Sequence, residues 1–357
     1  MQINNICLII PSLRHGGAER VISVLANEWS KNPDCKVNLL LLTKQEHFYQ
    51  IDSRVNIIEP QKLYTKNSIS KLFYTIWVFW FIRNKIYKLN PTSVLSFCER
   101  YNNIVLLALL GIKIPIFVSD RNNPSNNLGL IHEYLRKKLY KKAKGIIAQT
   151  ETAKTILFNK TGNLNIKAIP NPLRELKDNN AQKDNIILNV GRFELQKNQK
   201  ELIEIFSQLE LKKDWKLRII GVGSLKSELE ETIREKKLVD QVELLDFQKN
   251  IDEYFQQAKI FAFTSIYEGF PNALSEAMAN GLASIAYDCP TGPSELIIDN
   301  KNGFLVPLHN REEYIKKLQK LLDDEILRLQ ISEKAKDVKQ KFSTQSISNI
   351  YLNFITK

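Results

Sequence analysis

Short apolar runs of strand-like length recur along this 357-residue chain, with amphipathic segments between them. A first group comprises NICLII, KVNLLLL, TSVLSF, IPIFVS and KGIIAQT, and a second comprises NIILNVG, KLRIIGVG, QVELLDF, KIFAFTS and LASIAY. Strands that alternate with helices form parallel sheets, because each helix returns the chain to the edge where the next strand begins. The pattern therefore predicts an α/β protein of the doubly wound class.

A polar break separates the two groups of runs. Pro170-Asn171-Pro172 and residues 174–184 fit neither strand nor helix periodicity, which indicates a linker. We expect two Rossmann-like domains, 1–172 and 173–337, whose parallel sheets face one another across a cleft that holds the substrates. The segment from about 338 to 357 is predicted to be helical and to pack back onto the first domain.

The positive charge of the chain lies in its first half. Residues 1–172 contain 24 Lys and Arg against 10 Asp and Glu, a net charge of +14, whereas the whole chain carries +12. Such a surface suits nucleic acid, an anionic membrane or a phosphorylated substrate. The sequence has no RNP or zinc-finger pattern, so we expect no nucleic-acid partner and favour the other two.

The cysteines and the start of the chain bear on the compartment. Cys7, Cys35, Cys98 and Cys289 have no CxxC spacing, which predicts reduced thiols rather than a zinc site or disulfides. The first ten residues run into a strand without a basic leader region, so we expect a cytoplasmic protein.

One aromatic and basic segment, residues 68–90, stands apart. Ile76–Ile82 are seven consecutive apolar residues, too few for a membrane span of about 20. Two interpretations stay open, an interfacial helix on a membrane and a core helix that covers the first sheet. The flanking cations are Lys71, Arg83, Lys85 and Lys88, and a second basic cluster, interpreted as a solvated helix face, comprises Arg136, Lys137, Lys138, Lys141, Lys142 and Lys144.

Two glutamates flank a turn in YEGFPNALSEAMANG, residues 267–281. Glu268 follows the strand KIFAFTS, and Glu276 lies in the helix that follows the turn. A carboxylate pair could serve a glycosidase. Only Glu268, however, is placed to reach a reacting centre, and the free amides at the helix N-terminus suit a phosphate.

A second loop adds cations to this edge of the sheet. Arg192 and Lys197 lie between the strand NIILNVG and the next helix, and together they could balance a diphosphate. Gly16-Gly17 after the first strand, and Gly221-Val222-Gly223 after KLRII, are weaker signs of backbone close to a ligand.

These motifs together resemble retaining glycosyltransferases of family 4, which have the GT-B fold. The resemblance rests on GGAE at Gly16–Glu19, GRFELQKN at Gly191–Asn198, GVG at Gly221–Gly223 and the spacing of Glu268 and Glu276. It spans nearly the whole chain.

The resemblance implies a role for each matched residue. Arg192 and Lys197 would neutralise the diphosphate of a nucleotide sugar, Glu276 would accept hydrogen bonds from the ribose, and Glu268 would hold hydroxyls of the transferred sugar. Further donor-binding residues would be Gly16, Gly17, Gly223, Phe247, Gly269, Phe270, Pro271, Asn272, Ala273 and Leu274.

The chain departs from the family at Asp120-Arg121, where many relatives have a histidine. Arg121 is expected to contact a phosphate of donor or acceptor. Asp120 would orient the acceptor hydroxyl or pair with Arg121.

The segment Cys289–Val306 resembles the subset that builds polyprenyl-diphosphate-linked oligosaccharides for O-antigen, capsule or glycan assembly. This implies metal-independent, retaining transfer of an N-acetylhexosamine or hexose from a UDP-sugar, on the cytoplasmic face of an anionic inner membrane. Two alternatives are a nucleotide-sugar 2-epimerase of the same fold and a non-catalytic membrane scaffold. The motifs lack the catalytic carboxylates and histidines that an epimerase requires.

Overall fold

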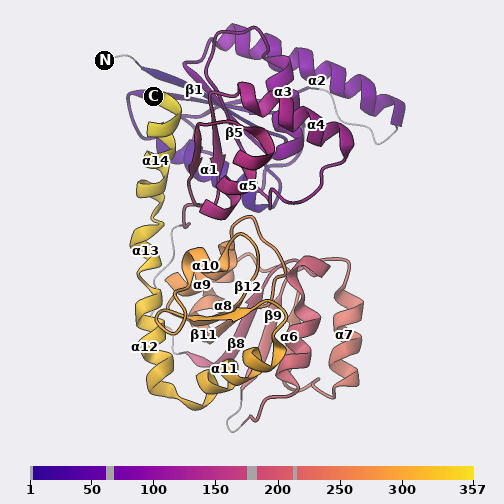
Figure 1. Ribbon diagram of the computed structural model, residues 1–357, viewed down its shortest axis with the longest axis vertical. Helices are drawn as coiled ribbons and strands as arrows, with labels where there is room; N and C mark the ends of the chain where they lie inside the picture. Colours follow the sequence, from indigo (N-terminus) through magenta and orange to yellow (C-terminus); the bar gives the residue numbers. More distant parts are fainter. Residues whose placement is uncertain (1–2, 62–67, 175–182, 212–214) are drawn as a thin grey trace. The chain divides into compact units, whose positions relative to one another are not determined.

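The computed structural model describes residues 3–61, 68–174, 183–211 and 215–357, with side chains in the helix that begins at Ser68 described from Phe73. The chain forms two compact units (Figure 1). Unit 1 comprises Met1–Pro172 and Thr344–Lys357, and unit 2 comprises Leu173–Ser343. Most of the expected linker, 175–182, lies outside the described residues.

Unit 1 is built on one parallel sheet in the order β3-β2-β1-β4-β5-β6-β7. The strand order reverses between β1 and β4, which pair in parallel although two strands separate them in the sequence. The strands are β1 (Asn4–Ile10), β2 (Cys35–Leu41), β3 (Asn56–Ile58), β4 (Ser93–Phe97), β5 (Ile116–Ser119), β6 (Gly145–Ala148) and β7 (Ile166–Ala168).

The helices of unit 1 return the chain between these strands. They are α1 (Gly17–Ser30), α2 (Ser68–Leu89), α3 (Glu99–Ala108), α4 (Leu130–Leu139), the short 3-10 turn η1 (Tyr140–Lys142), α5 (Glu151–Thr161) and α14 (Thr344–Thr356). None of the described helices is both long and apolar enough to cross a membrane.

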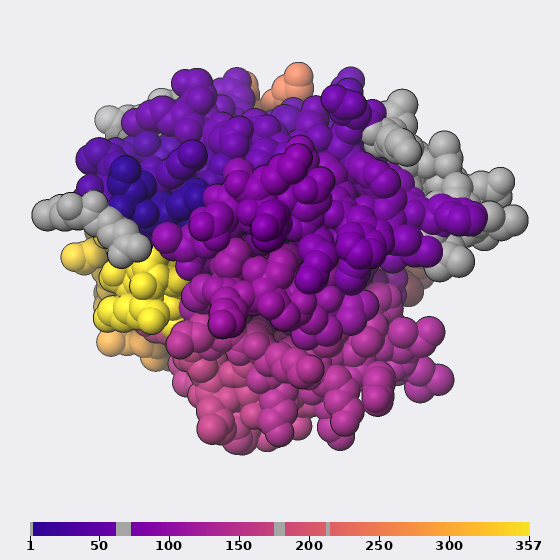
Figure 2. All heavy atoms as spheres, turned by 90° about the horizontal axis from the view of Figure 1, so that it is seen from above, coloured from indigo at the N-terminus to yellow at the C-terminus, as the bar shows by residue number. Residues whose placement is uncertain are grey.

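Helix α14 brings the C-terminal segment onto unit 1. The indole N–H of Trp29 in α1 donates to the carbonyl of Ser348 (3.1 Å), and Phe354 packs edge-on against Phe117 of β5. In Figure 2 the yellow C-terminal segment lies at the surface, and α14 contacts α1. The returning segment begins at Thr344 rather than at about 338, because α13 (Val338–Lys341) contacts α9 (Asn272–Ala279) of unit 2.

Helix α2 covers the first sheet, as one interpretation of the aromatic segment expected, and its contact with a membrane stays a prediction. One face is core, since Val78, Ile82 and Ile86 are buried against the sheet. The other face exposes Phe73, Ile76, Trp80 and Tyr87 to solvent.

Unit 2 repeats the doubly wound plan with the order β10-β9-β8-β11-β12-β13. The strands are β8 (Asp184–Val190), β9 (Lys216–Ile220), β10 (Val242–Leu245), β11 (Ala258–Phe263), β12 (Ala283–Asp288) and β13 (Phe304–Pro307). The helices are the 3-10 turn η2 (Leu195–Lys197), α6 (Gln199–Phe206), α7 (Lys226–Glu235), α8 (Ile251–Gln257), α9, α10 (Pro293–Leu296), α11 (Arg311–Asp323), α12 (Glu325–Ala335) and α13.

The predicted α/β class with two parallel sheets is confirmed. All ten predicted strands form, and most of their side chains are buried on both faces, as expected for sheets covered by helices on each side, whereas the edge strand β10 is only partly buried. Strands β3, β7 and β13 were not predicted. Each of the three lies at the edge of its sheet.

Candidate functional site

The two main sequence motifs of unit 2 meet where its strand order reverses. Strands β8 and β11 are hydrogen-bonded neighbours, and their carboxyl ends lead into GRFELQKN and YEGF. In doubly wound sheets ligands bind at this reversal, because the loops of the two strands diverge there and leave a crevice. The fold therefore places both motifs at one candidate site.

Lys197 and Glu268 form the central contact of this site. The ammonium group lies 2.5 Å from the carboxylate of Glu268, and it also lies over the ring of Phe263, 5.6 Å from the centroid. The side chain of Glu268 is only 6% exposed and that of Lys197 is 17% exposed. A buried carboxylate and a partly exposed cation are thus held in direct contact.

Gln196 ties the two loops to one another. Its carbonyl oxygen accepts a hydrogen bond from the backbone N–H of Ile266 (2.9 Å), and its side-chain amide donates to the carbonyl of Tyr267 (2.8 Å). Its side-chain oxygen accepts a bond from Arg192 (3.2 Å). Gln196 therefore fixes the position of Arg192 relative to Glu268, a role that the sequence did not reveal.

Arg192 is exposed, and Gln196 is the one described side chain to which its guanidinium is hydrogen-bonded. The backbone around it is rigid, because Gln199 donates to the carbonyls of Gly191 (3.3 Å) and Arg192 (2.9 Å). A fixed backbone beneath an exposed guanidinium suits contact with an anion from solution.

The glycines after β9 serve packing. A Cβ added to Gly221 would lie 1.9 Å from the carbonyl oxygen of Gly191, and one added to Gly223 would lie 2.3 Å from that of Phe193. The GVG loop therefore packs directly against the backbone of the loop that carries Arg192. Gly223 is also exposed, so its contact with a ligand stays a prediction, as does that of the half-exposed Phe247 beyond β10.

Glu276 lies in α9, and Arg174 holds its carboxylate. Arg174 Nε donates to Glu276 Oε2 (3.0 Å), and the same guanidinium forms a salt bridge with Asp252 (2.6 Å). Glu276 is buried, so this partner compensates the loss of hydration of its charge. Neither Arg174 nor Asp252 was predicted, because they lie 102 and 24 residues from Glu276 in the sequence.

The turn between the two glutamates packs against the loop after β12. The hydroxyl of Thr291 donates to the backbone carbonyl of Glu268, and Thr291 has a left-handed φ of 59°, which is unusual for a β-branched residue. Phe270 turns inward, with its ring 5.8 Å from that of Phe342. The backbone amides of Ala273 and Leu274, at the start of α9, make no hydrogen bond within the described part of the chain.

Cys289 is the thiol nearest to this site. Burial, together with the nearby carboxylate of Glu268, raises the pKa of Cys289 to about 12, so the thiol is protonated at neutral pH. Among the residues that the structure describes, no three His, Cys, Asp or Glu side chains gather where they could hold a metal ion.

In unit 1, the Gly16-Gly17 loop follows β1 at the corresponding reversal. Gly16 is the N-cap of α1, and a Cβ there would lie 2.2 Å from a carboxylate oxygen of Glu19. The glycine is therefore required by the side chain of Glu19, which folds back over the loop. Burial raises the pKa of that carboxyl, and Arg121 opposes the shift.

The expected pairing of Asp120 with Arg121 is wrong. Asp120 instead forms a salt bridge with Arg136 (3.2 Å) and accepts a hydrogen bond from Tyr140 (2.6 Å). Both side chains of the salt bridge are 1% exposed. Asp120 is therefore sealed inside unit 1, where it cannot orient an acceptor hydroxyl, and Arg136 does not belong to the solvated face predicted for its basic cluster.

Arg121 is also turned inward, against the expectation of a phosphate contact. Its guanidinium donates to Asn171 (2.5 Å) and to the hydroxyl of Tyr351 in α14 (3.1 Å), and it lies over the ring of Phe97. These contacts fasten α14 and the end of the first chain segment to the sheet. Glu99 completes the network by accepting the backbone N–H groups of Arg121 (2.6 Å) and Asn122 (2.7 Å).

Comparisons with known proteins show the family of this chain. The model of the family "Glycosyl transferases group 1" matches residues 174–338, which span both motifs of unit 2. The chain is 31% identical to the amylovoran biosynthesis glycosyltransferase AmsD of Erwinia amylovora, over 90% of each chain.

A second curated relative covers almost the full length. It is the N-acetylgalactosamine-N,N'-diacetylbacillosaminyl-diphospho-undecaprenol 4-alpha-N-acetylgalactosaminyltransferase of Campylobacter jejuni, 30% identical over 98% of each chain. Among solved structures, a mutant of S. aureus TarM in complex with fondaparinux, alpha-GlcNAc-glycerol and UDP is similar in fold. Its TM-score is 0.80 at 16% identity, and the match covers 99% of this chain and 100% of that one.

Proposed function

Because the chain belongs to the group 1 glycosyltransferases, we propose that it transfers a sugar from a UDP-sugar to a polyprenyl-diphosphate-linked saccharide. The transferred sugar is an N-acetylhexosamine or a hexose, and the configuration at its anomeric carbon is retained. The reaction serves the assembly of a bacterial surface polysaccharide or glycan.

The contact between Lys197 and Glu268 carries this proposal. Lys197 supplies a positive charge where the donor diphosphate would lie, and Glu268 supplies acceptor oxygens for the sugar hydroxyls on the other side of the scissile bond. A diphosphate would compete with Glu268 for the ammonium group. Donor binding would then free a carboxylate oxygen for the sugar at the same moment.

The chemistry of the transfer agrees with this arrangement. Negative charge grows on the leaving diphosphate as the anomeric bond breaks, so cations fixed beforehand at Arg192 and Lys197 stabilise the transition state more than the ground state. The two side chains would supply the charge that a metal ion supplies in other transferases. The departing phosphate oxygen would take the proton of the acceptor hydroxyl.

Helix α9 and its partners account for the nucleotide. Glu276, held by Arg174, would accept the ribose hydroxyls, and the amides of Ala273 and Leu274 would donate to the diphosphate. Residues 268–276 would then follow the donor from the sugar to the ribose.

The names of two relatives guide the choice of acceptor. The C. jejuni relative is named for a diphospho-undecaprenol acceptor, and AmsD for a polysaccharide. A lipid-linked acceptor would require contact with the cytoplasmic face of an anionic membrane, for which the net charge of +14 on residues 1–172 is suited.

The proposal is tested by incubating the full-length protein with a panel of UDP-sugars and a short saccharide linked to a polyprenyl diphosphate. We expect one donor to yield a product one sugar longer, with retained anomeric configuration by NMR. Release of free sugar with no acceptor product from any donor would count against transfer.

A matched pair of variants connects the activity to the site. Glu268→Gln removes the charge that Lys197 contacts, whereas Glu194→Gln alters a partly exposed carboxylate of the Lys197 loop that is hydrogen-bonded to Ser224. We expect transfer to fall only in the first variant. Equal activity in both would place the reaction elsewhere.

A further inference from the structure

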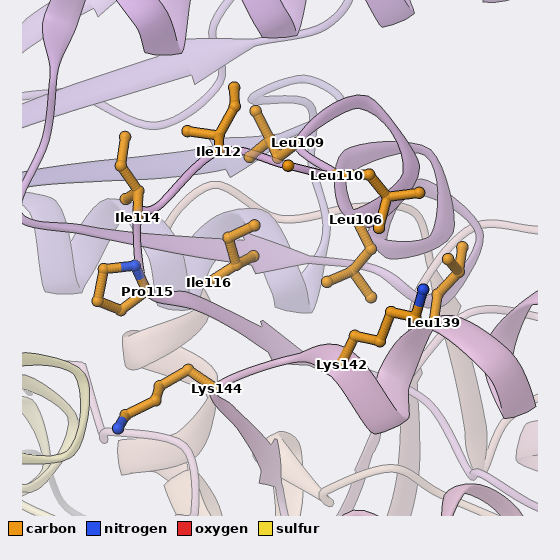
Figure 3. Close-up of a pocket in the computed structure, with 11 residues that line it drawn as sticks. Leu106, Leu109, Leu110, Ile112, Ile114, Pro115, Ile116, Leu139, Lys142 and Lys144 are labelled. Carbon is orange, nitrogen blue, oxygen red and sulfur yellow. The ribbon is translucent and has the colours of Figure 1, made fainter.

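Unit 1 contains an apolar cavity that the sugar chemistry does not use. It has a volume of about 500 Å³ and lies between the C-terminal end of α3 and the loop that leads into β5 (Figure 3). Its apolar lining includes Leu106, Leu109, Leu110, Ile112, Ile114 and Leu139. Lys142 and Lys144 lie along one side.

A wider groove continues from this cavity, since both are lined by Gly111, Ile112 and Ile114. The groove runs to the exposed face of α2, where Trp77, Trp80 and Tyr87 form its wall. Trp80 is 61% exposed, which is unusual for so large an apolar side chain. The cavity and the groove together are called the apolar groove below.

The segments that line the apolar groove contain only one sign of charge. No Asp or Glu occurs in residues 73–90, 106–116 or 139–144, which contain its lining residues. The same segments contain seven Lys and Arg. A partner that covers this surface must therefore be apolar where it meets the groove and anionic around it.

Two kinds of cation surround the groove. Arg83 is part of the fold, because it donates to the carbonyls of Ala108 (2.7 Å) and Leu110 (3.1 Å) at the end of α3. The ammonium groups of Lys113, Lys142 and Lys144 are exposed and form no ion pair or hydrogen bond with any described residue. Among the described residues of unit 1, these three lysines therefore have no polar partner whose position they would stabilise.

We propose that the apolar groove is a docking site for anionic membrane lipid, with acyl chains between α2 and α3 and lipid phosphates on Lys113, Lys142 and Lys144. This deepens the proposed function, because it gives a surface by which the enzyme reaches a membrane-held acceptor. Exposed aromatic side chains and lysines around an apolar surface are what an interfacial site requires, since the rings enter the acyl boundary while the ammonium groups stay at the phosphates.

The groove lies at the amino ends of the strands, whereas the Gly16-Gly17 loop lies at their carboxyl ends. Residues 109–115 precede β5, and Lys144 precedes β6. Helix α3, which runs from the carboxyl ends to the amino ends, spans ten residues, or about 15 Å. Substitutions in the groove therefore leave the sugar site intact, so that lipid docking and donor binding are separable by experiment.

Sedimentation of the full-length protein with vesicles tests the charges. We compare vesicles of phosphatidylglycerol and phosphatidylcholine with vesicles of phosphatidylcholine alone, and expect binding only to the anionic ones. The triple variant Lys113→Gln, Lys142→Gln, Lys144→Gln should bind roughly 100-fold more weakly, because each cation near an anionic surface contributes about fivefold.

The matched control removes the same charge from another part of unit 1. Lys154→Gln, Lys160→Gln, Lys167→Gln changes three lysines of α5 and β7, none of which lines the groove. Vesicle binding should change less than tenfold. Equal losses in the two triple variants would overturn the proposal, since net charge rather than this surface would then drive binding.

Tryptophan fluorescence tests whether acyl chains enter the groove. Of the four tryptophans, Trp77 and Trp80 line it, whereas Trp29 and Trp215 are buried. Anionic vesicles with brominated acyl chains should quench the wild type. Quenching should fall in Trp80→Phe without loss of sedimentation, because phenylalanine keeps the apolar contact.

Three further outcomes would overturn the proposal. They are sedimentation without quenching, full vesicle binding by the groove triple variant, and concentration-dependent dimerisation in ultracentrifugation that protects Trp80 and would assign the groove to a second copy of the chain. UDP binding, measured by calorimetry, should be equal in the wild type and both triple variants. If the wild type does not bind UDP, the proposed transfer is refuted, whereas the result on lipid binding still stands.

Discussion

The two units share one fold and use their charged residues in opposite ways. In unit 1 the salt bridge of Asp120 and Arg136 is 1% exposed on each side, and its neighbours complete the hydrogen bonds. In unit 2 Lys197 and Glu268 pair beyond the carboxyl ends of β8 and β11, and Arg174 pairs with Glu276 of α9, with the two cations 17% and 22% exposed.

The two kinds of pair differ in whether a ligand can reach them and replace one partner. No ligand can reach Asp120 or Arg136, so that pair contributes to folding alone. A diphosphate can reach Lys197, and so the cation can exchange one anionic partner for another. A charged residue at the carboxyl end of a strand in this fold is therefore a candidate for ligand binding only when its cation or anion remains accessible.

The largest effect is expected from Arg136→Ala. The substitution leaves Asp120 buried without its cation, which typically costs about 3–5 kcal/mol of unfolding free energy. Urea denaturation should show the loss, whereas the exposed neighbour Lys137→Ala should unfold like the wild type. Retained stability in Arg136→Ala would remove the contrast between the units.

Next in size is the loss of transfer in Lys197→Ala, and in Arg192→Ala. Removal of one preorganised charge contact lowers the rate by roughly 10²–10³-fold. Steady-state kinetics with the identified donor should show this at unchanged urea stability. Lys200→Ala, which removes an exposed lysine paired with Glu228, is the control and should transfer normally.

The pH dependence of unit 1 gives a third test. Burial, with Glu99 adding to it, raises the pKa of Asp120 from 3.8 to about 6, so the folded state holds the proton more tightly than the unfolded state. That contribution to stability is complete below pH 3.8 and is lost as the pH rises through about 6.

We therefore compare the wild type with Asp120→Asn, which cannot titrate, by urea denaturation from pH 4 to pH 7. The wild type should lose stability relative to the variant as the pH rises, by at most about 3 kcal/mol. A constant difference across this range would show that Asp120 is already ionised at low pH in the folded protein.

The smallest effect concerns Arg174, and it depends on the proposed ribose contact of Glu276. Arg174→Ala should weaken UDP binding roughly tenfold, within the range of coupling energies between neighbouring charges. The double variant with Glu276→Ala should bind no worse than Glu276→Ala alone. Additive losses in calorimetry, or equal losses with 2′,3′-dideoxy-UDP, would show that Arg174 acts independently of the ribose.

The sequence predicted the fold well because each central strand is a continuous apolar run. The missed strands are edge strands, two of them only three residues long. NII at Asn56–Ile58 and IKA at Ile166–Ala168 pair with a single neighbour, so little of their side-chain pattern is buried. Such segments become strands through tertiary pairing rather than through local preference.

The sequence predicted those residues of the candidate site that lie in recognisable motifs directly after neighbouring strands. Arg192, Lys197 and Glu268 lie within two loops whose strands are neighbours in the sheet. Partner choice was not predictable, because Asp120 is adjacent to Arg121 in sequence but contacts Arg136, one helix away. The roles of Gln196 and Arg174 likewise depend on distances between loops, which no spacing along the chain reveals.

Helix α14 has a consequence for the order in which the protein is made. Residues 173–343 of unit 2 are contiguous, so this unit can fold as soon as it leaves the ribosome. Unit 1 begins first, yet Tyr351 and Ser348 reach Arg121 and Trp29 only after all of unit 2 has been synthesised. The N-terminal unit should therefore reach its final packing last, and until then a chaperone would find Arg121 and the indole of Trp29 without these two partners.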